Sequence, residues 1–155
     1  MTLQRSSVIA SLPESILMSL KDDLLILYRD LDAEIAARGW FCRACGDCCC
    51  FEESGQILYC SSVEAEYLAE SGELPETIKE GVCPFLVDHH CSRRDHRTVC
   101  CRSYFCGLSG SGEMEELTER YLKRLKELHY RAGVLWEYHK LADHLKRRKP
   151  NGCKK

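Results

Sequence analysis

Cysteine is the residue type whose number and spacing point to chemistry in this sequence. The chain has 155 residues and 12 cysteines, and five of the cysteines fall within positions 42–50. A second block over residues 82–106 contributes five more: Cys83, Cys91, Cys100, Cys101 and Cys106. Thiols this dense bind a metal ion, bind an iron–sulfur cluster or form disulfide bonds. The N-terminal residues show no secretory signal pattern, so we expect a cytoplasmic protein with reduced, metal-binding thiols.

The spacing of the first block favours a metal ion. Cys42, Cys45 and Cys48 repeat the Cys-x-x-Cys pattern twice, and Gly46 allows a sharp turn between them. Such a turn brings two thiolates to one side of a loop, where zinc binds them at about 2.3 Å in a tetrahedron. The same run resembles part of a ferredoxin loop, although Glu52 stands where its fourth cysteine is expected. Zinc, iron and an iron–sulfur cluster therefore all stay open.

Two vicinal cysteine pairs bear on the number of sites. Neighbouring side chains of an extended segment point in opposite directions, so Cys48 and Cys49 should not easily bind one ion. Cys100 and Cys101 raise the same difficulty. Either two nearby sites share the pairs, or one site dominates and the spare thiols lie in the core. We favour one dominant site.

Charged and imidazole groups accompany the second cysteine block. Four thiolates around Zn²⁺ leave a net charge of about −2. Arg97 and Arg102 flank the Cys100–Cys101 pair, and we expect their N–H groups to donate to sulfur and offset this charge. Neighbouring Arg93 and Arg94 are expected to be ordinary surface residues. Three histidines in the block are alternative ligands, since imidazole is a common metal ligand: His89, His90 and His96.

The two blocks together resemble the YkgJ-type cysteine-cluster family, whose Cys-x-x-Cys-x-x-Cys-Cys domains are described as zinc- or iron-chelating. The resemblance covers residues 42–106, where Thr98 replaces a family proline and Phe105-Cys106 replaces Pro-Phe. The matching segments are Cys42-x-x-Cys45-Gly46-x-Cys48-Cys49, Cys83-Pro84-Phe85-Leu86, Cys91, Arg97 and Cys101-Arg102-x-Tyr104.

The resemblance implies metal chelation but no particular reaction. It implies seven metal ligands: Cys42, Cys45, Cys48, Cys49, Cys83, Cys91 and Cys101. Cys60, Cys100 and Cys106 compete for an eighth place, and Cys153 is expected to be a free surface thiol.

The function beyond metal binding has two alternatives. The cluster either serves a metal-dependent redox or modifying enzyme, or folds a zinc module that binds a protein partner. The sequence has no Gly-x-Ser-x-Gly motif and no phosphate-binding loop, so no catalytic residue is predicted. A net charge of −2 gives no reason to expect nucleic acid. No membrane partner is expected, because the longest apolar run is too short to span a bilayer.

Hydrophobic periodicity predicts the elements that hold the cysteines. Apolar residues at spacings of three and four predict helices over residues 13–38 and 113–147, the second stopping at Pro150-Asn151-Gly152. Ser61 and Glu64 fit a capping box for a helix over residues 63–70, and residues 57–59 fit a brief strand. We therefore expect one mostly α domain over residues 1–155. A loop-rich cysteine module over residues 40–106 lies between the two long helices.

Overall fold

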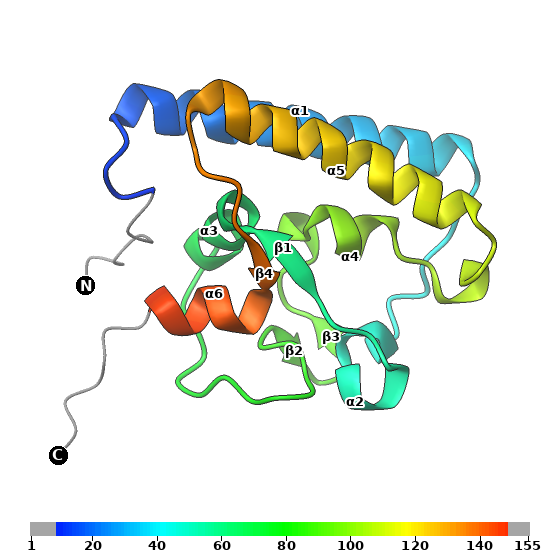
Figure 1. Ribbon diagram of the computed structural model, residues 1–155. Coiled ribbons are helices and arrows are strands. Elements are labelled where there is room, and N and C mark those ends of the chain that lie inside the picture. Colours follow the sequence, from blue (N-terminus) through cyan, green and yellow to red (C-terminus); the bar gives the residue numbers. More distant parts are fainter. Residues whose placement is uncertain (1–8, 149–155) are drawn as a thin grey trace, which may run out of the picture.

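The computed structural model describes residues 9–148 and is mostly helical, as predicted. Two long helices, α1 (Glu14–Ala37) and α5 (Glu113–Ala132), lie side by side, and the short elements lie against one side of this pair (Figure 1). The remaining helices and strands are α2 (Phe51–Ser54), α3 (Ser62–Glu70), α4 (Val99–Ser103), α6 (Leu141–Arg148), β1 (Tyr59–Ser61), β2 (Leu86–Val87), β3 (His90–Cys91) and β4 (Tyr138–Lys140). Short 3₁₀ turns are η1 (Asp47–Cys49), η2 (Arg94–His96) and η3 (Cys106–Leu108).

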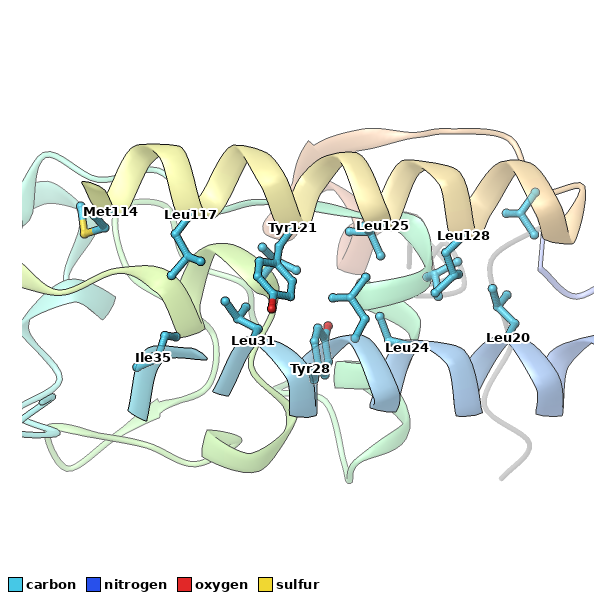
Figure 2. Close-up of a cluster of buried hydrophobic side chains, with 14 of the residues drawn as sticks. Leu20, Leu24, Tyr28, Leu31, Ile35, Met114, Leu117, Tyr121, Leu125 and Leu128 are labelled. Carbon is cyan, nitrogen blue, oxygen red and sulfur yellow. The ribbon is translucent and has the colours of Figure 1, made fainter. Parts of the chain in front are cut away.

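The interface of α1 and α5 forms the larger part of the core. Leu24 and Leu31 of α1 and Leu117 and Leu125 of α5 are at most 1 % exposed. Figure 2 shows these leucines facing one another between the two helices. The apolar stripes predicted at helical spacing therefore meet, and the expected pairing of the two long helices is confirmed.

The helix predicted over residues 113–147 is wrong beyond residue 132. Gly133 adopts a left-handed φ of 70° and caps α5, because glycine takes this conformation without a Cβ penalty. The chain then enters β4, which pairs antiparallel with β1 and sets His139 opposite Cys60. Leu135, whose spacing fits the apolar stripe of the predicted helix, is 66 % exposed. The stop predicted at residues 150–152 lies outside the described residues.

The predicted capping box forms at the start of α3. Ser61 Oγ accepts from the Glu64 amide at 3.3 Å, and the Glu64 carboxylate accepts from the Ser61 amide at 3.0 Å. The strand expected over residues 57–59 forms two residues later, over Tyr59–Ser61, because it pairs with β4.

Two buried charged residues fix α4, the helix that carries Cys100 and Cys101. The Glu64 carboxylate accepts from the Val99 amide at 2.7 Å and from the Tyr28 hydroxyl at 3.2 Å. Arg102 donates to Asp32 at 2.6 Å, and its guanidinium lies 4.2 Å from the centre of the Tyr28 ring. These contacts tie α4 to α1 and α3, so the position of the cysteine pair depends on the helical frame.

No helix within residues 9–148 is both long enough and apolar enough to cross a membrane.

Leu125→Ala should lower the free energy of unfolding by about 2–5 kcal/mol, because the substitution opens a cavity in the α1–α5 interface. Leu135→Ala is the control, since its side chain is mostly exposed and should change the free energy by about 0.5 kcal/mol or less. Urea denaturation at equal metal content measures both. Equal losses for the two variants would contradict the helix pairing.

Candidate functional site

The seven predicted ligand cysteines all line one cavity of about 140 Å³: Cys42, Cys45, Cys48, Cys49, Cys83, Cys91 and Cys101. Cys100 and Cys106 also line it, whereas Cys60 is buried elsewhere and Cys50 is not part of the lining. Every described cysteine is a free thiol. Cys153 lies outside the described residues. The structure thus brings the two cysteine blocks together, and their role as metal ligands stays a prediction.

Main-chain contacts hold the two blocks against each other. The Cys83 amide donates to the Cys49 carbonyl at 2.8 Å. Gly46 adopts a φ of 78°, and a Cβ added there would lie only 2.2 Å from the His89 carbonyl oxygen. His90 Nδ1 lies 3.2 Å from the Ala44 carbonyl oxygen. The cysteine loop is therefore pressed against the β2–β3 hairpin, and glycine is needed for this close approach.

The vicinal pairs lie on helical turns and not in extended segments. Cys48 and Cys49 belong to η1, and Cys100 and Cys101 belong to α4. Consecutive side chains of a helical turn are about 100–120° apart, so both can face the same cavity. The assumption that these pairs lie in extended segments is therefore wrong, and all four residues line the cavity.

The thiol of Cys49 is the centre of a four-sulfur group. It makes side-chain hydrogen bonds to Cys48, Cys83 and Cys91. The hydrogen bond from Cys49 lowers the pKa of Cys48 to about 6 and that of Cys91 to about 6, and it also lowers the pKa of Cys83. The pKa of Cys49 itself is raised, because its hydrogen bonding with Cys48, Cys83 and Cys91 favours its protonated form. We call Cys48, Cys49, Cys83 and Cys91 the Cys49 group.

Backbone amides support negative charge on several sulfurs. The Ala44 amide donates to Cys42 Sγ at 3.4 Å. The amide of Phe85 likewise lowers the pKa of Cys83, and the amide of Arg93 lowers that of Cys91. In each case the donor lies two residues after the cysteine, so the chain turns around the sulfur. Hydrogen bonds to the charged form favour the thiolate.

Arg97 supplies positive charge to the sulfurs, whereas its donation to sulfur stays a prediction, since its Nε donates to the Arg94 carbonyl at 2.9 Å. It lines the cavity, and its charge lowers the pKa of both Cys48 and Cys91. Arg94 adds a smaller effect at Cys91. The corresponding expectation for Arg102 is wrong, because its donors go to Asp32 and to the carbonyls of Arg97 and Asp95.

Arg93, expected to be an ordinary surface residue, binds the chain that follows α3. Its guanidinium donates to the carbonyls of Ser71 at 2.6 Å and Glu73 at 2.8 Å.

No histidine lines the cavity in the described part of the chain. His96 lies 4.7 Å from Tyr67, ring centre to ring centre, and His89 and His90 occupy the hairpin. Sequence reasoning missed Tyr138, whose hydroxyl shares a 3.1 Å hydrogen bond with Cys100 Sγ. Its position in β4 was hidden by the incorrect helix prediction.

Desolvation raises the pKa of Cys100 to about 11 and that of Cys101 to about 12. Cys100 and Cys101 are therefore protonated at neutral pH, whereas the lowered pKa values of Cys48 and Cys91 favour their thiolates.

The donor types fit a thiolate-bound metal. Nine cysteines line one cavity, and backbone amides and the Arg97 guanidinium favour the thiolate form of some of them, such as Cys91. Within residues 9–148, however, no group of three or more His, Cys, Asp or Glu side chains already has the arrangement of a metal site. A tetrahedral ion holds its thiolate sulfurs about 3.8 Å apart, so side chains of the Cys49 group have to rotate to close a shell.

Comparison with known proteins gives no match to a family model, to a curated protein or to a solved structure. The resemblance to the YkgJ-type family therefore remains a motif-based prediction.

In the reduced, metal-free protein we expect Cys91 to react with iodoacetamide faster at pH 7 than Cys100 or Cys101. The thiolate is the nucleophile, and a pKa of about 6 leaves Cys91 mostly ionised at pH 7. Its rate should fall as the pH is lowered through 6. Peptide mass spectrometry of timed samples measures each site. First labelling at Cys100, or no change in the Cys91 rate between pH 7 and pH 5, would contradict the arrangement around Cys49.

Proposed function

We propose that the chain is a metal-binding protein that holds one zinc or iron ion through the thiolates of the Cys49 group. The observation that carries this proposal is the contact of the Cys49 thiol with Cys48, Cys83 and Cys91, which come from three short segments. Four thiolates are a complete ligand set for a tetrahedral ion. The motif resemblance to the YkgJ-type family supports the same class of function.

The close contacts within the Cys49 group favour a single ion over an iron–sulfur cluster. In a cubane cluster each cysteine binds a different iron atom, so the cluster separates the cysteine sulfurs. A single tetrahedral ion instead leaves its sulfurs about 3.8 Å apart, near the distance of thiol–thiol hydrogen bonds. Cys49 interacts with three neighbouring thiols, and these side chains still have to rotate to reach the spacing of a tetrahedral shell.

The surroundings of the Cys49 group suit an anionic metal centre. Four thiolates and a divalent ion carry a net charge of about −2, which needs compensation when water is partly excluded. The amides of Phe85 and Arg93 and the guanidinium of Arg97 supply positive partial or full charge at the sulfurs. Binding an ion releases the remaining thiol protons, so affinity rises with pH until all four thiols are ionised.

A closed four-thiolate ion would act as a structural clamp between the cysteine loop and the β2–β3 hairpin. Zinc would supply only this structural role at such a site, because it has no redox chemistry.

An enzyme is the second candidate function, because the thiols line a cavity and not a closed core. Phe41 and Ile57 line the same cavity and are 81 % and 56 % exposed, so an apolar rim surrounds its entrance. A partner or a small molecule with an apolar part is suited to this rim.

Cys49→Ser should remove one equivalent of metal per chain, because it takes away the central ligand. Cys50→Ser is the matched control: Cys50 is the next residue, but it does not line the cavity. Metal analysis of the anaerobically purified variants measures the difference. Equal metal content in the two variants would contradict the assignment of Cys49 as a metal ligand.

The anaerobically purified protein should contain no acid-labile sulfide, because a single ion brings no inorganic sulfur. A zinc form should be colourless, and a single-iron form should contain iron without sulfide. Absorption spectra and sulfide analysis decide between these and a cluster. A brown protein with sulfide and a band near ~400 nm would exclude the single ion.

A further inference from the structure

His129 is a fully buried histidine in the last turn of α5. The residue is 0 % exposed, and neither ring nitrogen has a hydrogen-bond partner within the described part of the chain. Buried polar groups are normally paired, because burial removes the water that would otherwise hydrate them. An imidazole without partners is therefore tolerated in this core only as the neutral base, since the charged form would cost far more.

The residue lies where α5 ends and the chain turns towards β4 (Figure 1). The Val134 amide donates to the His129 carbonyl at 3.0 Å, across the left-handed Gly133. The His129 ring meets Trp136 edge-on, with the two ring centres 5.0 Å apart. We call residues 129–136 the α5–β4 joint. Both the backbone and the ring of His129 therefore contact the segment that follows the helix.

The segment after the joint reaches the cysteine cavity. Trp136 stacks on Tyr138 with ring centres 5.5 Å apart, and the Tyr138 hydroxyl shares a 3.1 Å hydrogen bond with Cys100 Sγ. The Glu137 carbonyl accepts from the Ser62 amide at 3.0 Å, which binds the same segment to the start of α3. A displacement of Trp136 therefore acts directly on the residue that contacts Cys100.

Within residues 9–148, no charged side chain favours the protonated form of His129. Burial lowers the pKa of His129 to about 4, and only the backbone of Leu135 opposes this effect. The buried titratable groups of α1 and α3, Tyr28 and Glu64, bind each other instead. The charged residues nearest along the chain are exposed: Glu127, Arg131 and Glu137.

We propose that His129 is an acid switch, whose protonation opens the α5–β4 joint, displaces Trp136 and releases Tyr138 from Cys100. An imidazolium in the closed joint has no counter-ion, whereas water hydrates it once the joint opens. This inference goes beyond metal binding and holds for the chain with or without an ion.

The direction of the pH dependence follows from where the proton binds more tightly. The pKa of His129 is lower in the closed joint than its ordinary value of 6.5, which an open joint would restore. The open form therefore binds the proton more tightly. The closed joint has its full stability above pH 6.5 and loses stability as the pH falls towards 4.

Hydrogen exchange followed by NMR measures the opening, because a bonded amide exchanges only when its hydrogen bond breaks. The reporters are the amides of Val134, bound to His129, and Ser62, bound to Glu137. Between pH 7.5 and pH 4.5 their protection factors should fall roughly 20- to 100-fold in the parent protein. Each factor is taken relative to an unstructured peptide at the same pH. The Leu27 amide, in the middle of α1, reports unfolding of the helical frame.

His129→Leu is the decisive variant, since leucine is apolar and cannot be protonated. At equal metal content, its two reporter amides should not show the fall seen in the parent protein. His96→Gln is the matched control: burial also lowers the pKa of His96, but its ring packs on Tyr67 of α3. This control should keep the fall of the parent protein. Far-UV circular dichroism checks each fold, and His129→Gln replaces His129→Leu if the latter does not fold.

The outcomes test each part of the switch. An equal fall in the parent protein and in His129→Leu would overturn the role of His129. A fall at Val134 without one at Ser62 would confine the opening to the joint and overturn the release of Tyr138. An equal fall at Leu27 would mean that the whole frame unfolds, which overturns a local switch. An NMR titration that gives His129 a pKa near 6.5 would contradict its buried, neutral state.

Discussion

The backbone contact between the cysteine loop and the segment that follows Gly81 is the constraint on which the site depends. The Glu52 amide donates to the Gly81 carbonyl at 3.0 Å, and the Cys83 amide donates to the Cys49 carbonyl at 2.8 Å. Gly46 allows the loop to lie directly on the hairpin turn. Because these are main-chain contacts, sulfur atoms from both blocks converge without any sulfur–metal bond. The fold therefore brings the two cysteine blocks together, which would lower the cost of ordering them around an ion, and the side chains of the Cys49 group would still have to rotate.

The two long helices supply no residue to the cysteine cavity, and instead hold α4 in position. Their leucine interface holds α1 in place, and α1 in turn supplies Tyr28 and Asp32 as partners for α4. Buried charged groups such as Glu64 and Arg102 add little net stability, because desolvation opposes their attraction. Their directional bonds nevertheless fix where α4 lies. This placement decides that Cys101 faces the cavity.

Electrostatics explains why so many thiols are tolerated in one place. Hydrogen bonding with Cys49 lowers the pKa of Cys48 and Cys91 and raises the pKa of Cys49, while repulsion between neighbouring thiolates opposes their simultaneous ionisation. Amides and Arg97 offset part of this repulsion. A divalent cation would offset the rest, which is consistent with the proposed metal site.

The sequence by itself determined the helical class, the first helix and the capping box at Ser61, because these depend on local periodicity and spacing, whereas the set of cysteines expected to gather was implied by the motif resemblance. It did not determine where the last helix ends, since the left-handed conformation of Gly133 is stabilised by the pairing of β4 with β1. Nor did it reveal that the vicinal cysteines lie on helical turns. It also did not reveal that Arg102 donates to Asp32, whereas the charge of Arg97 acts on the cysteine thiols. These features depend on contacts between residues far apart in sequence, which only the tertiary structure specifies.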